Sequence, residues 1–311
     1  MKKFIFTLVI FGIGLLGIAF YADFAVSKKL QKSTIRMLVG WNEIYSGNLK
    51  SDVLIVGASR VLYQYSPFIL DSILGINSYN FGMDGSGINR QIVKYDAFRR
   101  FNLKPKLIIQ NIDFSEMEMT FGYEKEQFFP YFFDKPLKKA ISKYENLSLF
   151  EKYIPYYRYI GYTDFVKERR VWPYSVPYYD NNIYKGYFGS KRLWDGSELA
   201  KQTEVLYEQD ETALRLFDQY LAKACSENIQ VIFVYAPIYI GATKKIKNIE
   251  GMYQMYDSIA KKYNIPILDY NYDPISYDTT YFYNATHMNK TGSELFSIKL
   301  AHDIDSLLQI K

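Results

Sequence analysis

The chain has 311 residues, 49% hydrophobic and 23% charged, which is the composition of a folded globular protein and excludes a disordered one. Its net charge is +5, with basic and acidic residues interspersed, so we expect no nucleic-acid partner. A single cysteine, Cys225, excludes an intrachain disulfide, and the two histidines, His287 and His302, are too few for a histidine-rich zinc site. We therefore expect neither a metal nor another cofactor.

The N-terminus predicts membrane association. Two lysines precede a nearly unbroken apolar run, Phe4–Phe20, which together with the next two residues is long enough to span a bilayer. We expect a transmembrane anchor over residues 1–22, a single pass through the inner (cytoplasmic) membrane, and an extracytoplasmic remainder. A cleaved signal peptide, giving a secreted or periplasmic protein, is the alternative, but cleavage after Ala22 or Ala25 places a large or charged residue at the −3 position. A buried helix of a soluble domain is the remaining alternative.

The rest of the chain predicts a polar stalk or linker over residues 23–50, followed by a single domain over residues 51–311. In that domain short apolar runs alternate with amphipathic segments. The predicted strands are 51–59, 75–82, 105–114, 229–237 and 265–270, and the predicted helices are 84–101, 211–228, 252–264 and 290–308. Continuous apolar strands that alternate with helices are typical of a parallel sheet covered on both faces. We predict an α/β, three-layer flavodoxin-like fold with a five-stranded parallel sheet, in which sites form at the carboxyl ends of the strands.

An aromatic-rich segment at about 115–205 interrupts this alternation. Five prolines are scattered among its aromatic residues: Pro130, Pro136, Pro155, Pro173 and Pro177. A loop of that length without structure is uncommon inside a compact domain, so the segment predicts an inserted cap or lid.

Small and polar residues follow the first three predicted strands. Ser59 comes after a glycine turn and ahead of a helix, a position that exposes its hydroxyl and leaves its backbone N–H available for an oxyanion. A purely structural turn is the alternative, whereas a dinucleotide site is excluded because the further glycines it needs are absent. Gly82 after the second strand brings a backbone N–H close to a ligand or forms a plain turn. Asn111 and Asp113 follow the third strand and offer an amide donor or a carboxylate.

The last candidate segment is the polar loop over residues 284–289, ahead of the C-terminal helix. His302 lies within that helix beside Asp303, where a solvated or capping role is expected. His287 is therefore the predicted imidazole base. Asn284, three positions earlier, is placed to orient its ring, as asparagine does in Cys-His-Asn enzymes.

Together these segments resemble the SGNH (GDSL-type) hydrolase family, in its diverged membrane-anchored branch related to polysaccharide O-acetyl-handling and D-alanylation accessory proteins. The resemblance covers about residues 52–308 without the aromatic insertion. It implies that Ser59 is the nucleophile, that Gly82 and Asn111 are oxyanion donors, and that His287 completes the site. Arg60, next to the nucleophile, is assigned with them to oxyanion or substrate binding.

The sequence departs from the family pattern at two positions. Asn284 stands where the family has aspartate, so imidazolium stabilisation is weaker unless another carboxylate, such as Asp278, substitutes. The third block is also irregular, which leaves Asp113 as a rival to Asn111.

The resemblance implies a serine esterase or O-acyl (acetyl) transferase that acts on cell-envelope or extracellular polysaccharide. The expected partners are the membrane, through the N-terminal helix, and a glycan or acylated polysaccharide substrate. The alternative is an SGNH-fold binding or assembly component of a polysaccharide pathway with weak or no catalysis. Asn284 favours that alternative, and the presence of both Ser59 and His287 argues against it.

Overall fold

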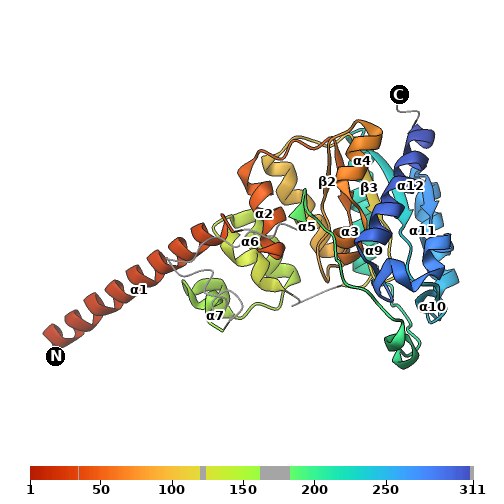
Figure 1. Cartoon of the computed structure of the whole chain (residues 1–311). Helices are drawn as coiled ribbons and strands as arrows, with labels where there is room; N and C mark the ends of the chain where they lie inside the picture. Colours follow the sequence, from red (N-terminus) through yellow and green to blue (C-terminus); the bar gives the residue numbers. More distant parts are fainter. Residues whose placement is uncertain (34, 120–123, 162–182, 309–311) are drawn as a thin grey trace. The chain divides into compact units, whose positions relative to one another are not determined.

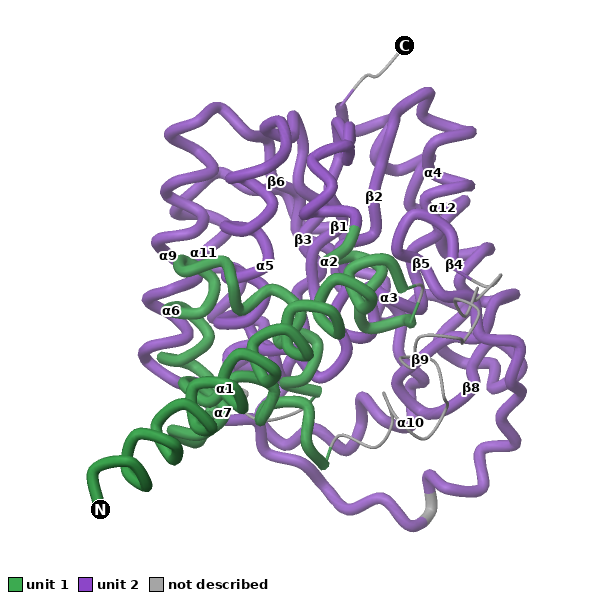
Figure 2. The backbone as a smooth tube through the Cα atoms, turned by 90° about the vertical axis from the view of Figure 1, so that its left-hand side faces the viewer, with its two compact units in different colours: residues 1–42, 121–180 green, residues 43–120, 181–311 purple. Residues whose placement is uncertain are grey.

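The computed structural model describes residues 1–33, 35–119, 124–161 and 183–308 (Figure 1). The chain divides into two compact units, each made of two chain segments (Figure 2). Unit 1 comprises Met1–Asn42 and Phe121–Asp180, and unit 2 comprises Glu43–Thr120 and Asn181–Lys311. Of the expected insertion, residues 121–180 thus fall in unit 1 and residues 181–205 in unit 2. Residues 120–123 and 162–182 of it lie outside the described residues.

Unit 2 is built on a parallel sheet with the strand order β2-β1-β3-β6-β7. The strands are β1 Val53–Val56, β2 Ser78–Asn80, β3 Leu107–Asn111, β6 Gln230–Tyr235 and β7 Ile267–Asp269. Leu54 of β1 pairs with Tyr79 on one side and Ile108 on the other, and the first three strands are buried along their whole length. This order is that of flavodoxin-like folds, so the predicted five-stranded parallel α/β fold is confirmed.

Helices cover both faces of this sheet, as Figure 2 shows. One layer holds α5 Ile88–Phe101, α9 Glu211–Ser226 and α11 Ile249–Tyr263, and the other holds α3 Ser59–Gln64, α4 Pro67–Leu74 and α12 Lys290–Leu308. Phe217 of α9 and Tyr256 of α11 pack against Phe233 of β6, with ring centroids 5.7 and 6.4 Å away. On the opposite face Phe296 of α12 packs against Tyr65, at 5.1 Å. Apolar stripes on these helices therefore hold them to the sheet.

The shorter elements of unit 2 include two hairpins, β4 Ile183–Tyr184 with β5 Tyr187–Phe188, and β8 Phe282–Asn284 with β9 His287–Met288. Helix α10 spans Ile240–Thr243, and the 3₁₀ helices are η3 Ser197–Lys201, η4 Pro274–Tyr277 and η5 Thr279–Tyr281.

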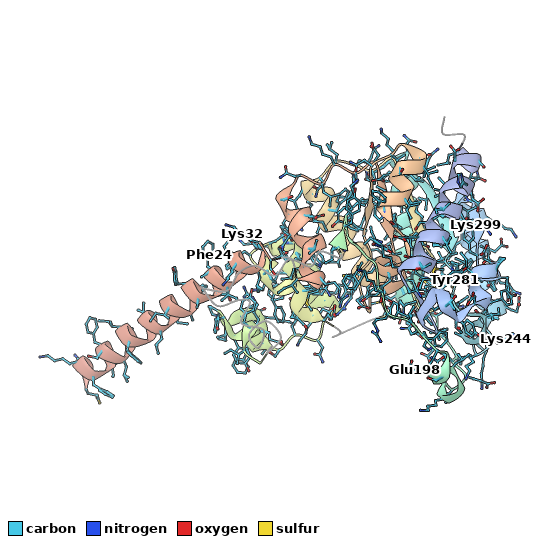
Figure 3. All side chains as sticks on the ribbon, viewed as in Figure 1. Phe24, Lys32, Glu198, Lys244, Tyr281 and Lys299 are labelled. Atoms are coloured by element: carbon cyan, nitrogen blue, oxygen red, sulfur yellow. The ribbon has the colours of Figure 1, made fainter. Side chains whose placement is uncertain are left out.

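Unit 1 contains α1 Lys2–Leu30, η1 Lys125–Tyr131, α6 Lys135–Tyr144, α7 Leu149–Tyr153 and η2 Tyr157–Tyr159. Helix α2 Arg36–Ser46 begins in unit 1 and ends in unit 2. The apolar run predicted over residues 4–22 is one continuous helix, as expected, and α1 extends beyond it to Leu30. Its apolar window has a mean hydropathy of 2.4 and none of it is buried, so α1 is long and apolar enough to cross a membrane. In Figure 3 the side chains of this part project outward from the helix, up to the labelled Phe24.

The polar end of α1 is packed inside unit 1. Asp23 and Ser27 are 2% and 0% exposed. The Asp23 carboxylate accepts the Tyr156 N–H at 2.6 Å and forms an ion pair with Arg158. The hydroxyls of Ser27 and Tyr159 are hydrogen-bonded at 2.8 Å. Residues 23–30 therefore form part of a core within unit 1.

Candidate active site

Ser59 lies where the chain leaves β1 and enters α3. Gly57 sits between the two, and a Cβ added there would lie 2.6 Å from the Val61 side chain and 3.0 Å from the Asn111 Cβ. Only glycine allows this close approach of strand end and helix. As the first residue of α3, Ser59 has a backbone N–H without an acceptor inside the helix. Its hydroxyl and its N–H are therefore both placed at the carboxyl edge of the sheet.

The β8–β9 hairpin carries the histidine to the same edge. His287 begins β9, opposite Asn284 of β8. Its Nε2 lies 2.7 Å from the Ser59 Oγ, a hydrogen bond between residues 228 positions apart in the sequence. The proximity of Ser59 and His287 expected from the sequence is thus observed.

Asn284 fixes the orientation of this imidazole. The Asn284 Oδ1 accepts the backbone N–H groups of Thr286 at 3.0 Å and His287 at 2.8 Å, so the amide oxygen, not the nitrogen, faces the ring. Oδ1 is also 3.0 Å from His287 Nδ1. Because an oxygen acceptor faces Nδ1, the ring proton resides there and the Nε2 lone pair faces Ser59. Asp278, the other carboxylate considered, instead accepts from the N–H and hydroxyl of Thr280.

Three further residues surround the ring and were not predicted from the sequence. The Thr286 hydroxyl is 3.1 Å from His287 Nδ1. The Tyr283 ring stacks on the imidazole at 5.4 Å, and Tyr63 contacts it edge-on at 5.5 Å. Thr286 and Tyr283 adjoin the polar loop in the sequence, whereas no sequence signal distinguishes Tyr63 from the other tyrosines.

This environment makes His287 a weak base. Burial, followed by the charge of the Arg60 guanidinium, lowers the pKa of His287 to about 4. The imidazole is therefore neutral near pH 7, in the form that accepts a proton.

Arg60 and Asp113 form a buried ion pair beside Ser59. Arg60 is 4% exposed, and its Nε donates to Asp113 Oδ2 at 2.5 Å while a terminal nitrogen contacts the other carboxylate oxygen. Burial disfavours the charged guanidinium, but the Asp113 carboxylate outweighs it and raises the pKa of Arg60. Burial, with Asp113 adding to it, raises the pKa of the neighbouring Glu116 well above its ordinary value. The Asp113 carboxylate is the one that pairs with Arg60 beside Ser59.

The two predicted oxyanion donors differ, because the Gly82 N–H is engaged in a hydrogen bond inside the protein and, among the described residues, the Asn111 Nδ2 is not. The Gly82 N–H donates to Asn80 Oδ1 at 3.0 Å, which contradicts the expectation that it points into the crevice. A Cβ at Gly82 would lie 2.3 Å from the Leu62 backbone nitrogen, so the glycine is required for packing against α3. Asn111 is fully buried, and its Oδ1 accepts the Tyr65 hydroxyl at 2.7 Å. Its Nδ2 has no hydrogen-bond partner within the described part of the chain.

A cleft of about 450 Å³ opens at the Ser59–His287 pair. Arg60 and Asp113 line it as well. One part of its wall is apolar and consists of Val205, Ile238, Ala242 and Ile246. Another part is polar and consists of Ser115, Gln202 and Thr203. The segment 201–205, which closes the predicted insertion, thus contributes to the wall. The cleft can hold a group with an apolar and a polar part next to the serine hydroxyl.

No family model and no curated protein matches the chain. Solved structures that are similar to it at low identity include three bacterial proteins. A candidate lipolytic protein of the G-D-S-L family from Desulfitobacterium hafniense is 17% identical, with a TM-score of 0.41, over 82% of this chain and 99% of its own. A candidate platelet activating factor from Streptococcus pneumoniae is 11% identical, with a TM-score of 0.43, over 95% of this chain and 98% of its own. A candidate acylhydrolase from Bacteroides fragilis is 12% identical, with a TM-score of 0.40, over 85% of this chain and 96% of its own.

Proposed function

We propose that the chain is a serine esterase or O-acyl transferase that acts on acylated cell-envelope or extracellular polysaccharide. The observation that carries this proposal is the hydrogen-bonded series from Ser59 Oγ to His287 Nε2 and from His287 Nδ1 to Asn284 Oδ1, open to a cleft. The sequence resemblance to SGNH hydrolases supports it. The apolar helix α1 and the mixed lining of the cleft support a membrane-attached enzyme for an acyl group on a polar carrier.

The proposed reaction has two steps. His287 Nε2 takes the Ser59 hydroxyl proton while Oγ attacks the ester carbonyl carbon, and the Ser59 N–H binds the developing oxyanion. His287 then returns the proton to the leaving alcohol, which leaves an acyl-serine. Water, or a sugar hydroxyl in the transferase reaction, next gives its proton to His287 and attacks the acyl carbon. His287 passes that proton to Ser59 Oγ as the bond between Oγ and the acyl carbon breaks, which restores both residues. Gly82 can supply a second donor only if its N–H exchanges Asn80 for the oxyanion.

The lowered basicity of His287 sets the expected rate. A displacement of its pKa from 6.5 to about 4 disfavours the imidazolium by about 3 kcal/mol. Asn284 offers the ring an acceptor but no negative charge to offset this. We therefore expect slow turnover in the native protein.

The test is acetate release from a panel of acetylated sugars and from p-nitrophenyl acetate, with the detergent-solubilised full chain. Ser59→Ala is the essential comparison, and His302→Gln is the matched control because His302 lies exposed on α12. We expect release to fall by about 10³-fold or more in Ser59→Ala and His287→Ala, and to be unchanged in His302→Gln. A rate that does not depend on Ser59 would refute the proposal.

The second candidate function is a binding or assembly component with the same fold. The uncharged Asn284 and the low pKa of His287 are the observations that favour it. Calorimetric titration with an acetylated oligosaccharide discriminates the two functions. An assembly component binds it without any Ser59-dependent release, whereas the enzyme turns it over and binds it only transiently.

A further inference from the structure

A second recess, of about 170 Å³, lies in unit 1 where the apolar run of α1 ends. Phe20 and Asp23 of α1 line it on one side, and on the other it is lined by the two residues that follow η1, by residues of α6 and α7, and by residues before and within η2. Every one of its lining residues belongs to unit 1, so the recess is independent of the Ser59–His287 site.

The walls of this recess are held at a fixed position along α1. Asp23 binds both Arg158 and the Tyr156 N–H, and the Arg158 guanidinium lies 5.3 Å from the Phe132 ring centroid and 5.7 Å from that of Phe133. At the next residue of α1, the Phe24 and Phe133 rings contact edge-on at 6.1 Å. These contacts place the recess directly after the exposed apolar run.

The recess carries an excess of positive charge. Arg158 is neutralised by Asp23, whereas Lys138 and Lys152 form no ion pair with a carboxylate among the described residues. The Lys138 ammonium lies 5.5 Å from the Tyr153 ring centroid and 6.0 Å from that of Phe132, so aromatic faces contact the cation in place of a carboxylate. Burial, and next the Arg158 charge, lowers the pKa of Lys138. An anion that enters the recess would relieve this repulsion.

Exposed apolar side chains surround the recess. Tyr153 is 72% exposed, and large apolar residues of α7 and its neighbours are also exposed, namely Phe133, Leu149, Phe150, Ile154 and Ile160. Of these, Phe133, Tyr153 and Ile154 line the recess together with the exposed Phe20 of α1. Aromatic and basic side chains at the end of an apolar helix are typical of the membrane interface, where rings lie among the lipid headgroups.

We propose that this recess binds the phosphate of an anionic phospholipid headgroup, and that the exposed side chains around it lie in the headgroup layer. Lys138 and Lys152 contact the phosphate, and the ring of Tyr153 lies beside the upper part of the lipid. The lipid is the occupant rather than a second protein, because the surface continues the apolar surface of α1 and adds positive charge to it.

The first test measures lipid preference. The full chain in detergent is equilibrated with equal amounts of phosphatidylglycerol and phosphatidylcholine, and the retained lipids are quantified by mass spectrometry. We expect at least about fivefold retention of phosphatidylglycerol over phosphatidylcholine in the wild type, and a ratio near one in Lys138→Gln/Lys152→Gln. Lys223→Gln/Lys261→Gln, which removes two exposed lysines of unit 2, is the matched control and keeps the preference.

The same assay includes two controls. The first distinguishes the loss of positive charge from misfolding of the variant, and the second distinguishes binding of a lipid from binding of free phosphate. Lys138→Arg/Lys152→Arg should retain the preference, because it keeps both positive charges. Millimolar inorganic phosphate should not displace the lipid. Equal ratios in the glutamine variant and the wild type, or displacement of the lipid by inorganic phosphate, would overturn the proposal.

The second test measures depth in the bilayer. A nitroxide is attached to Phe150→Cys in full-length protein that carries Cys225→Ser and is reconstituted in phosphatidylglycerol-containing liposomes. A label at Lys223→Cys on α9 of unit 2 provides the comparison. We expect the label at 150 to be shielded from a water-soluble nickel relaxant and accessible to oxygen. Equal nickel accessibility at the two positions would contradict the proposed contact with the headgroup layer.

Discussion

At the scale of single residues, Asn284 gives His287 the correct tautomer without adding a negative charge. Asn284 Oδ1 fixes the proton on Nδ1, as an aspartate would, because two backbone N–H groups hold the amide oxygen toward the ring. An aspartate would both orient the His287 ring and place a negative charge beside it, whereas Asn284 only orients the ring.

Asn284→Asp tests the contribution of the missing charge. Aspartate keeps the acceptor at the Oδ1 position and adds a negative charge beside Nδ1, so we expect the pKa of His287 to rise and Ser59-dependent turnover to increase about tenfold. Paired rate measurements on the two proteins check this, with Ser59→Ala subtracted as background. A fast native enzyme that is unaffected by the substitution would show that the charge of this residue is irrelevant to the reaction.

The pH dependence follows from the pKa of His287, which lies at about 4 instead of 6.5. The folded protein binds this proton less readily than the unfolded chain, so stability from this group is complete above pH 6.5 and falls as the pH decreases toward 4. The acid limb of kcat/KM should accordingly have its midpoint near pH 4. NMR titration of the two histidine Cε1–H signals, assigned with His302→Gln, measures the value directly, and a midpoint near 6.5 for His287 would contradict the prediction.

The sequence predicted the residues of the site better than their contacts. Ser59 and His287 could be located because each directly follows or precedes a regular element with a clear pattern. The Arg60–Asp113 ion pair could not, since it joins residues on different elements 53 positions apart. Cys225 is exposed, because the buried residues of α9, such as Leu221 and Ala224, lie on a stripe that excludes it.

At the scale of elements, long periodic segments were predictable and short ones were not. All five strands of the sheet and the helices α5, α9, α11 and α12 occur within or near their predicted ranges. Helix α3 has 6 residues, too few to show a complete amphipathic period, and each strand of the β4–β5 hairpin has 2. Tertiary contacts, not local sequence, determine such elements.

Helix α1 also gives a prediction about processing. Cleavage after Ala25 would remove Asp23 and leave the buried Arg158 without its carboxylate, which typically costs about 3–5 kcal/mol. We therefore expect the protein extracted from membranes to retain its N-terminal segment. Intact-mass spectrometry checks this, with Asp23→Asn as a comparison expected to lower the thermal stability. A mature chain that begins at Asp23 or Val26 would favour a cleaved signal peptide.

At the scale of the whole molecule, both units are discontinuous in sequence. Unit 1 takes residues 1–42 and 121–180, and unit 2 takes the remainder, so the chain passes from one unit to the other three times. The anchor, stalk and hydrolase-like domain expected from the sequence are consecutive segments, whereas each compact unit combines two separate segments of the chain. In the sequence, the only indication of these discontinuous units is the length of the aromatic-rich segment at about 115–205.

This interleaving imposes an order on biosynthesis. Strands β1, β2 and β3 are synthesised before residues 121–180, whereas β6, which pairs with β3, comes after them. At about 5–20 residues per second, the roughly 120 residues between β3 and β6 take about 6–24 seconds to emerge from the ribosome. Throughout that interval the β3 edge has no native neighbour on one side, and unpaired apolar strand edges are templates for aggregation. Unit 1, whose last residue is 180, is complete before the sheet can close.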